Sequence, residues 1–284
     1  MKSIKEKVQE AQQLVENAQY IYINAGAGMS ADLGTATYWT GKNNKYAGTV
    51  DKSGLTALQH ATEMTWDTHR KEQIEYFHKT YNIFQHLHQH NRENHYTSLL
   101  SYLNKENKEY FVQTSNVDSA FYNYGYNEDA LYEAHGSYRY SQCLAQPQEH
   151  GIYPTNNNVE TYTPCPTCGS DSRPNALFFD DYKYQPDIAH VQRQNKYIFE
   201  EKLQTNNAVL IEIGAGTTVP TIRNHTLRIN AGQDIPVIRI NASSHEDDID
   251  GISALIKPSA IAPILELKTK AQTGLKILVG TQQQ

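Results

Sequence analysis

The sequence predicts an α/β protein built on a Rossmann-like parallel sheet with helices on both faces, a small inserted module and a helical insertion. A first apolar segment, Tyr20–Asn24, runs directly into a glycine-rich turn, as strands do where a sheet approaches a phosphate group. Two later segments, Ala208–Gly214 and Pro236–Ile240, are near-continuous apolar runs typical of buried parallel strands. Between Gly136 and Tyr184 the composition shifts to Cys, Pro, Gln, Asn and Gly with poor periodicity, which indicates a separate small module.

Composition excludes several classes of protein. The 284 residues carry a formal net charge of −6, so no global basic field favours a nucleic acid or an anionic membrane as partner. The longest apolar runs fall far short of the roughly 20 residues that span a bilayer, and Met1–Glu10 is too charged for a secretory signal. Three cysteines do not make a disulfide framework. We therefore expect a cytoplasmic protein with one large domain and a smaller inserted one.

The N-terminal segment predicts a helix followed by the first strand of the sheet. Apolar residues recur at helical spacing from Ile4 to Ala18, and Ser3 and Glu6 stand in capping-box register. The strand that follows ends in the turn Gly26-Ala-Gly28-Met-Ser30, with Gly34 four residues later. This order of elements predicts the first nucleotide-contacting loop of a doubly wound sheet.

A helical insertion is predicted between residues 38 and 103. One apolar stripe runs along it, formed by Ile74, Phe77, Tyr81, Phe84 and Leu87. His86, His88 and His90 alternate in the same segment. Because a spacing of two places neighbouring side chains on different sides of a helix, we expect these histidines on the solvated helix surface and not around a metal ion.

These patterns divide the chain into three parts. The Rossmann-like domain is expected to comprise residues 1–37, 104–135 and 185–284. The helical insertion covers residues 38–103, and the small module covers residues 136–184.

Polar side chains follow two further predicted strands, Tyr110–Gln113 and Leu131–Ala134. Asn116 and Asp118 come directly after the first of these strands, and His135 comes directly after the second. Chemistry at a nicotinamide ribose needs a carboxylate or an amide to fix the carboxamide and a base that is neutral near pH 7, and these three residues are of those types. Taken singly, however, each is more commonly a turn former or a structural histidine.

A second small-residue turn supports a dinucleotide site. The segment Gly214-Ala-Gly216-Thr-Thr218 follows a predicted buried strand, so two strand ends could close on one dinucleotide where the strand order reverses. Either turn alone could be an ordinary tight turn. An acidic residue that would read the ribose is missing from the expected second strand, which argues against a hydride-transfer dehydrogenase.

The cysteines indicate a metal site in the small module, which would then be zinc-ribbon-like. Cys165 and Cys168 have the spacing of a metal knuckle, and Cys143 precedes them without a partner cysteine. Structural zinc needs four nitrogen or sulfur ligands, and His150 could supply the fourth. The alternative is a metal-free knuckle in which the thiols only pack.

Taken in order, the motifs resemble the sirtuin family over most of the chain. The loop that begins at Gly26 looks like the family's first nucleotide loop, and Thr114-Ser-Asn116-Val-Asp118 looks like its Thr-Gln-Asn-Ile/Val-Asp motif. His135-Gly136-Ser137 is similar to the catalytic His-Gly segment, and Arg173-Pro-Asn-Ala-Leu-Phe-Phe179 resembles the strand beside the acyl-lysine substrate. The turn at Gly214–Pro220 and the pair Ile240-Asn241 match the later adenosine-side motifs.

The resemblance implies an NAD-consuming reaction in which nicotinamide leaves the ribose and a modified lysine's acyl oxygen attacks the ribose carbon. By the same resemblance Asp118 would hold the carboxamide, Asn116 would order the ribose and nearby water, and His135 would be the general base. The residues that would contact NAD are Gly26, Ala27, Gly28, Ser30, Gly34, Tyr38, Ser115, Asn116, Asp118, His135, Gly214, Gly216, Thr217 and Asn241.

Two segments depart from the family pattern. After its first loop the family reads Gly-Ile-Pro-Asp-Phe-Arg-Gly, whereas this chain reads Gly34-Thr-Ala-Thr-Tyr38-Trp39-Thr-Gly41. Tyr38 keeps an aromatic ring, but Trp39 does not replace the contribution of an arginine to phosphate contact. Phe179-Asp180-Asp181 stands where the family has Phe-Gly-Glu, and the added charge is expected to alter the choice of acyl peptide.

Three functions are consistent with these residues. The leading expectation is NAD-dependent removal of acyl groups from lysine, with an acylated protein or peptide as partner. The second is ADP-ribosyl transfer to protein or plain NAD hydrolysis, which the altered segment 35–39 and Asp180 favour because neither reaction needs acyl-lysine binding. The third is a non-catalytic NAD-binding module. The sequence leaves acyl-chain preference and oligomeric state open.

Overall fold

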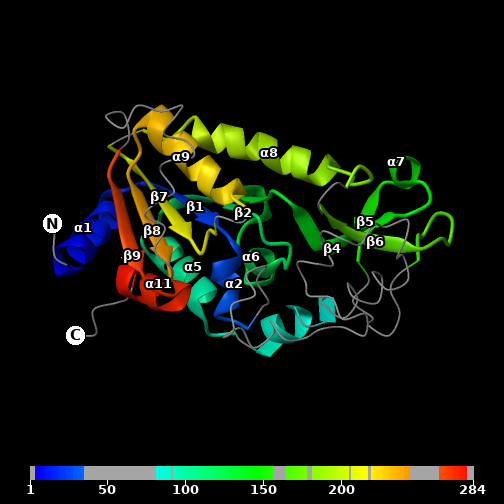
Figure 1. The fold of residues 1–284 in the computed structure, drawn as a ribbon, viewed down its shortest axis with the longest axis horizontal. Helices are drawn as coiled ribbons and strands as arrows, with labels where there is room; N and C mark the ends of the chain where they lie inside the picture. Colours follow the sequence, from blue (N-terminus) through cyan, green and yellow to red (C-terminus); the bar gives the residue numbers. More distant parts are fainter. Residues whose placement is uncertain are drawn as a thin grey trace.

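A six-stranded parallel sheet forms the centre of the computed structural model (Figure 1). The structure describes residues 4–34, 81–82, 84–90, 92–155, 164–177, 181–204, 206–216, 219–242 and 262–279. The strands are β1 Tyr20–Ala25, β2 Glu109–Thr114, β3 Leu131–Glu133, β7 Ala208–Ile213, β8 Val237–Asn241 and β9 Ile264–Lys268. Every neighbouring pair runs parallel.

The strand order, β3-β2-β1-β7-β8-β9, makes this a doubly wound sheet. Counted along the chain within this sheet, the order is 3-2-1-4-5-6, the Rossmann order, so the direction of winding reverses between β1 and β7. Tyr20 pairs with Glu109 on one side of β1 and with Ala208 on the other. In such a sheet, ligands bind beyond the carboxyl ends of the strands at this reversal.

Helices cover both faces of the sheet because the strands are apolar on both sides. All six residues of β7 are buried, as the near-continuous apolar run predicts. On one face pack α1 (Ile4–Asn17), α5 (His95–Lys105) and α11 (Ala271–Val279), with the short α6 (Ala120–Asn123) beside them. On the other face pack α8 (Asp187–Glu200) and α9 (Thr221–Gln233) (Figure 1).

The small module is a three-stranded antiparallel sheet that enters the chain between β3 and α8. Its strands are β4 (Gly136–Cys143), β5 (Ile152–Pro154) and β6 (Ser172–Ala176), in the order β5-β4-β6, and α7 (Pro147–His150) joins β4 to β5. It lies to one side of the parallel sheet in Figure 1. The remaining elements are α2 (Ala27–Ala31) and the 3-10 turn η1 (Glu128–Ala130).

Residues 84–90 are helical and pack against both the module and α6. Phe84 joins Tyr138, Leu144 and Ala176 in a small apolar cluster. The expectation that all three alternating histidines are solvated was wrong for His88, whose side chain is 8% exposed. Asn123 Nδ2 donates a 2.8 Å hydrogen bond to His88 Nδ1, so the polar ring nitrogen is satisfied although the ring is buried.

Among the described residues, no helix is both long and apolar enough to cross a membrane.

Candidate functional site

The two glycine turns meet at the sheet reversal. Gly26 N donates to Ile213 O at 2.9 Å, and Gly28 N donates to Gly214 O at 2.9 Å. A Cβ atom on Gly28 would lie 2.6 Å from the Cα of Gly214, and Gly214 itself has a φ of +61°. Direct backbone contact between the loops therefore requires glycine at these positions.

Asn116 connects the first glycine loop to the end of β2. Its Nδ2 donates to Gly26 O and to Ser30 Oγ, at 3.1 Å in each case. Its backbone N–H donates to Thr114 Oγ1 at 3.0 Å. Asn116 is buried, so these bonds fix its amide beside the loop.

The first turn of α5 holds the same loop from the other side. Tyr96 OH shares a 2.7 Å hydrogen bond with Ser30 Oγ, and His95 Nε2 donates to Met29 O at 2.7 Å. Burial lowers the pKa of His95, and its hydrogen bond to the Met29 backbone offsets part of that effect. His95 and Tyr96 were missed by the sequence analysis because each lies 66 residues along the chain from its partner in the loop.

Asp118 lies at the start of α6. Its side chain is buried, and Oδ1 accepts a 3.0 Å hydrogen bond from Ala120 N. Ser119, the next residue, has a φ of +61°, a conformation that costs a non-glycine residue about 1–2 kcal/mol. Its Oγ shares a 2.7 Å bond with Ser137 Oγ, which ties the turn to β4 and compensates part of that cost.

His135 follows β3 and faces the N-terminus of α9. Its Nε2 lies 3.2 Å from Thr221 Oγ1. Burial lowers the pKa of His135, and a hydrogen bond to the Ser115 backbone offsets part of that effect. Burial therefore favours the neutral form of the ring.

The backbone around His135 connects the two sheets. Gly136 has a φ of +74°, and a Cβ there would lie 2.2 Å from Asn175 O. Leu177 N donates to His135 O at 2.8 Å, so the chain beyond the end of β6 runs beside the histidine.

A buried charge network supports the second glycine loop. Arg223 Nη2 and Asn241 Nδ2 both donate to Ala215 O, at 2.6 and 2.7 Å. Glu212 accepts from Arg239 Nε at 2.6 Å and lies 3.6 Å from Arg223 Nη1. Asn241, expected at the adenosine side, thus holds the loop, and the supporting charges of Arg223 and Glu212 had no signal in the sequence.

Arg173, in the segment that resembles a substrate-side strand, is an internal structural residue. Its side chain is 0% exposed, and its guanidinium makes a bidentate pair with Asp181, with Nη1 donating to Oδ1 at 2.7 Å and Nη2 to Oδ2. Nη2 also donates to Ala176 O at 2.7 Å. Asp181 therefore neutralises the charge of Arg173, and the pair holds β6 in place.

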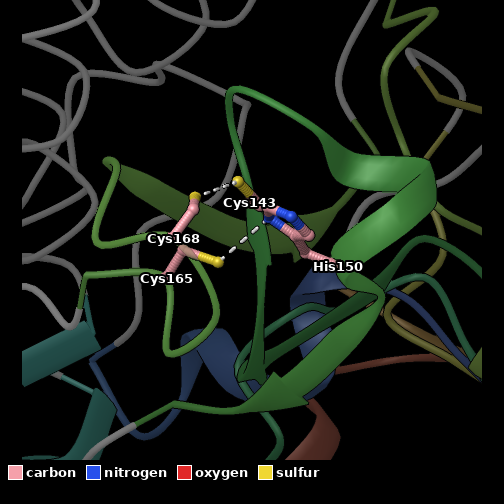
Figure 2. A group of neighbouring side chains, drawn as sticks. All are labelled: Cys143, His150, Cys165 and Cys168. Atoms are coloured by element: carbon pink, nitrogen blue, oxygen red, sulfur yellow. Dashed lines mark hydrogen bonds between the residues drawn. The ribbon is translucent and has the colours of Figure 1, made fainter.

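The three cysteines and His150 form one cluster (Figure 2). Their ligand atoms all lie within 4.8 Å of one another, with Cys143 Sγ 3.7 Å from Cys168 Sγ and Cys165 Sγ 3.5 Å from His150 Nδ1. A tetrahedral zinc with ordinary bond lengths has ligand–ligand edges of about 3.8 Å between two sulfurs and about 3.5 Å between sulfur and nitrogen. The cluster can therefore hold zinc with all four positions filled by protein.

The local electrostatics also suit a metal. Burial opposes ionisation of the Cys165 thiol, but the backbone amides of Cys168 and Thr167 donate to it and bring its pKa down to about 6. Thiolates are the form that binds zinc.

The structure thus brings Gly26, Gly28 and Gly214 together, with Asn116 bonded to the first loop and Ser115 N donating to Ala25 O at 3.1 Å. Ala27 and Ser30 lie in α2, and Gly34 follows it. Gly216 lies within the second loop and is exposed. Tyr38, Thr217, Phe179 and Asp180 lie outside the described residues.

The sequence of the chain is similar to known proteins. The model described as Sir2 family matches residues 26–219. A protein of Fusarium oxysporum f. sp. cubense named probable bifunctional ADP-ribose hydrolase/ADP-ribosyltransferase is 24% identical over 275 residues. The match covers 87% of this chain and 45% of that protein, so the chain spans less than half the length of this fungal relative.

Solved structures share the fold at low sequence identity. A Sir2 homologue in complex with NAD has a TM-score of 0.66 at 18% identity, covering 95% of this chain and 92% of that one. A mutant Sir2 homologue in complex with 2′-O-acetyl ADP ribose has a TM-score of 0.68 at 16% identity, covering 95% and 94%. Sir2Tm bound to a propionylated peptide has a TM-score of 0.61 at 16% identity, covering 95% and 96%.

Proposed function

Because the chain belongs to the Sir2 family of NAD-dependent enzymes, we propose that it binds NAD across its two glycine loops and breaks the bond between nicotinamide and ribose. The observation that carries this proposal is the contact between the loops at the sheet reversal, with Asn116 bonded to the first loop and His135 facing α9 beside the second. Ligand binding at such a reversal is the general behaviour of doubly wound sheets. Solved relatives in complex with NAD and ADP-ribose support it.

Each polar residue has a role that suits its surroundings. Asp118 binds the nicotinamide carboxamide, and Asn116, already fixed by Gly26 and Ser30, orders the ribose. His135 takes a proton from a ribose hydroxyl, because burial lowers its pKa and so favours the neutral imidazole that can accept one. When the C1′–N bond breaks, its electron pair leaves with nicotinamide, and an acceptor oxygen forms the new bond to C1′.

We favour the acyl oxygen of a modified lysine as the acceptor, which makes the protein a lysine deacylase. The chain beyond β6 hydrogen-bonds to His135 O through Leu177, so a peptide aligned with that segment would lie near the base. The Arg173–Asp181 pair makes this support rigid. A relative solved with a propionylated peptide is consistent with such a substrate.

Transfer of ADP-ribose to a protein side chain is the second candidate. The name of the fungal relative, an ADP-ribose hydrolase/ADP-ribosyltransferase, favours it. Both candidates release nicotinamide and differ only in the group that attacks the ribose carbon.

One set of assays separates the candidates. The purified full chain is incubated with NAD labelled in its ADP-ribose part, with and without acetylated or longer-acylated peptides. The assay follows nicotinamide, O-acyl-ADP-ribose, ADP-ribose and the label transferred to protein. Peptide-dependent release of nicotinamide with a deacylated product supports the first candidate, and label on protein without an acyl peptide supports the second. Nicotinamide released together with free ADP-ribose, without an acyl peptide and without ADP-ribose on protein, indicates NAD hydrolysis. Binding of NAD without release of nicotinamide indicates a non-catalytic NAD module.

The His135→Ala variant tests the proposed base. We expect at least a hundredfold loss of turnover, since positioned general bases contribute roughly 10²–10⁴-fold. His190→Ala, a substitution of an exposed histidine on α8, is the matched control and should keep full activity. Unchanged deacylation in His135→Ala would refute the role of His135.

A further inference from the structure

Two histidines of the helical insertion lie on one exposed face. His86 and His90 are four residues apart within the helical stretch 84–90, and both are exposed. Their ring centroids are 4.0 Å apart, with an angle of 31° between the ring planes. A spacing of two separates neighbouring side chains, but a spacing of four stacks them, so His86 and His90 are neighbours whereas His88 points to the other side.

The hydrogen bonding of His90 fixes which of its nitrogens can bind a metal. His90 Nδ1 lies 2.8 Å from the carbonyl oxygen of His86, and because a carbonyl only accepts, Nδ1 carries the proton. In the neutral ring the lone pair is then on Nε2. A ring N–H bonded to a backbone carbonyl is the usual way in which proteins orient a metal-binding histidine.

The opposite side of this helix packs against α6 and the small module. This packing fixes the helix so that His86 and His90 face solvent. His88 is buried against α6, accepts from Asn123 Nδ2, and lies edge-on to Tyr124 with ring centroids 5.4 Å apart. Phe84 lies edge-on to Tyr138 at 5.4 Å. The helix thus holds two imidazoles one turn apart on one face, the spacing at which paired histidines on a helix bind one metal ion.

We propose that His86 and His90 form a second metal site that binds a borderline divalent ion such as Ni²⁺, Cu²⁺ or Zn²⁺ through one nitrogen of each imidazole. It differs from the cysteine cluster in having nitrogen ligands only and open coordination positions for water or another ligand. Imidazole suits these ions, and the affinity order is expected to be Cu²⁺ above Ni²⁺. The bound ion bridges one helical turn and stabilises the helix that braces α6.

Ni²⁺ is the test ion because it prefers nitrogen ligands and is not reduced by thiols. The untagged full chain is loaded with a single equivalent of zinc, which the four-ligand cysteine cluster takes before the two-ligand histidine pair. It is then titrated with Ni²⁺ by calorimetry, and its melting temperature is followed in parallel. We expect one Ni²⁺ per chain in addition to the zinc, and a rise in melting temperature.

Single substitutions locate the site. His86→Asn and His90→Asn should each weaken Ni²⁺ binding by roughly tenfold or more and abolish the rise in melting temperature. His190→Asn is the matched control, since His190 is exposed on α8 and the residues four away are Pro186 and Gln194. Because both substitutions are on the surface, melting without Ni²⁺ verifies that the variants fold. Absence of a Ni²⁺ site in the zinc-loaded protein, or equal binding by the two variants and the parent, would overturn the proposal.

Discussion

Gly136 joins His135 to the small module in a backbone conformation that leaves no space for a side chain. Its φ is +74°, and a Cβ would meet Asn175 O at 2.2 Å. We expect Gly136→Ala to lower the free energy of unfolding by about 3 kcal/mol or more, the sum of left-handed strain and overpacking. Urea denaturation measures this loss.

Gly125→Ala separates the two causes. Gly125 has a φ of +90°, but the nearest atom to an added Cβ is Leu100 Cδ2 at 3.8 Å. This variant should therefore lose only the strain, about 1–2 kcal/mol. Equal losses at the two glycines would show that the contact with Asn175 does not matter.

Thr221 should influence the pH at which His135 acts. Burial lowers the pKa of His135, so nicotinamide release should persist below the ordinary histidine pKa of about 6.5 and fall as the ring becomes charged at lower pH. If the Thr221 hydroxyl donates to Nε2, it stabilises the neutral ring. Thr221→Val would then move the acidic limb of the kcat profile to higher pH.

The conservative variant is the control for this prediction. Thr221→Ser keeps the hydroxyl and should reproduce the parent pH profile. A valine variant with an unshifted acidic limb would show that the contact does not act on the base.

At the residue scale, the sequence motifs predicted the residue types of the candidate site but not what holds them. Asn116, Asp118 and His135 stand out because polar residues directly follow strands. Tyr96, Thr221 and Arg223 give no such signal, since each lies in a helix pattern and acquires its partner only when distant segments pack. His88 was misjudged for the same reason, because its burial depends on α6 and not on local spacing.

At the element scale, α5 begins with a cap that also serves the glycine loop. Asn94 Oδ1 accepts from Tyr96 N at 2.8 Å and Thr97 N at 3.3 Å, and Thr97 Oγ1 accepts from Asn94 N. Asn94→Ala should lower the free energy of unfolding by about 1 kcal/mol. It should also weaken NAD binding, because the first turn of α5 fixes Met29 and Ser30.

Asn94→Ser is the matched variant, since serine also caps helices well. It should retain most of the free energy of unfolding, measured by denaturation, and most of the affinity for NAD, measured by calorimetry. Loss of affinity in both variants with no loss of stability would point to a direct role of the amide and not to capping.

The five predicted strands agree closely with the structure, with a difference of at most one residue at each end. The apolar runs at β7 and β8 are buried on both faces, which makes their pattern unambiguous. β9 was not predicted. It is an edge strand of five residues with alternate burial, a pattern too short to distinguish from a loop.

At the scale of the whole molecule, the cysteine cluster should determine whether the module stays folded. The purified protein should contain about one zinc per chain, and His150→Ala should lose it together with several degrees of melting temperature. His150→Cys, which restores four ligands, should retain zinc. Metal analysis by mass spectrometry and thermal melting test both variants, and a His150→Ala protein with unchanged zinc would exclude His150 as a ligand.

The architecture of the sheet could be predicted because a strand, a glycine turn and a helix recur in a fixed order. The alternation of strands and helices along the chain implies a doubly wound sheet. In such a sheet the loops after β1 and β7 lie where the strand order reverses. It does not specify where residues 84–90 dock, since that contact depends on matching Phe84 and His88 to two separate surfaces.

The register of β4 and β6 has a consequence for how such proteins can diversify. Gly136 and Ala176 are paired, so the first residue of β4 and the last residue of β6 lie side by side. An inserted module whose two ends are neighbours can be lengthened, shortened or exchanged without changing the path of the chain in the domain that carries it. His135 directly precedes the first residue of the module. Exchanging the module would therefore place a different substrate-facing surface beside the same proposed base.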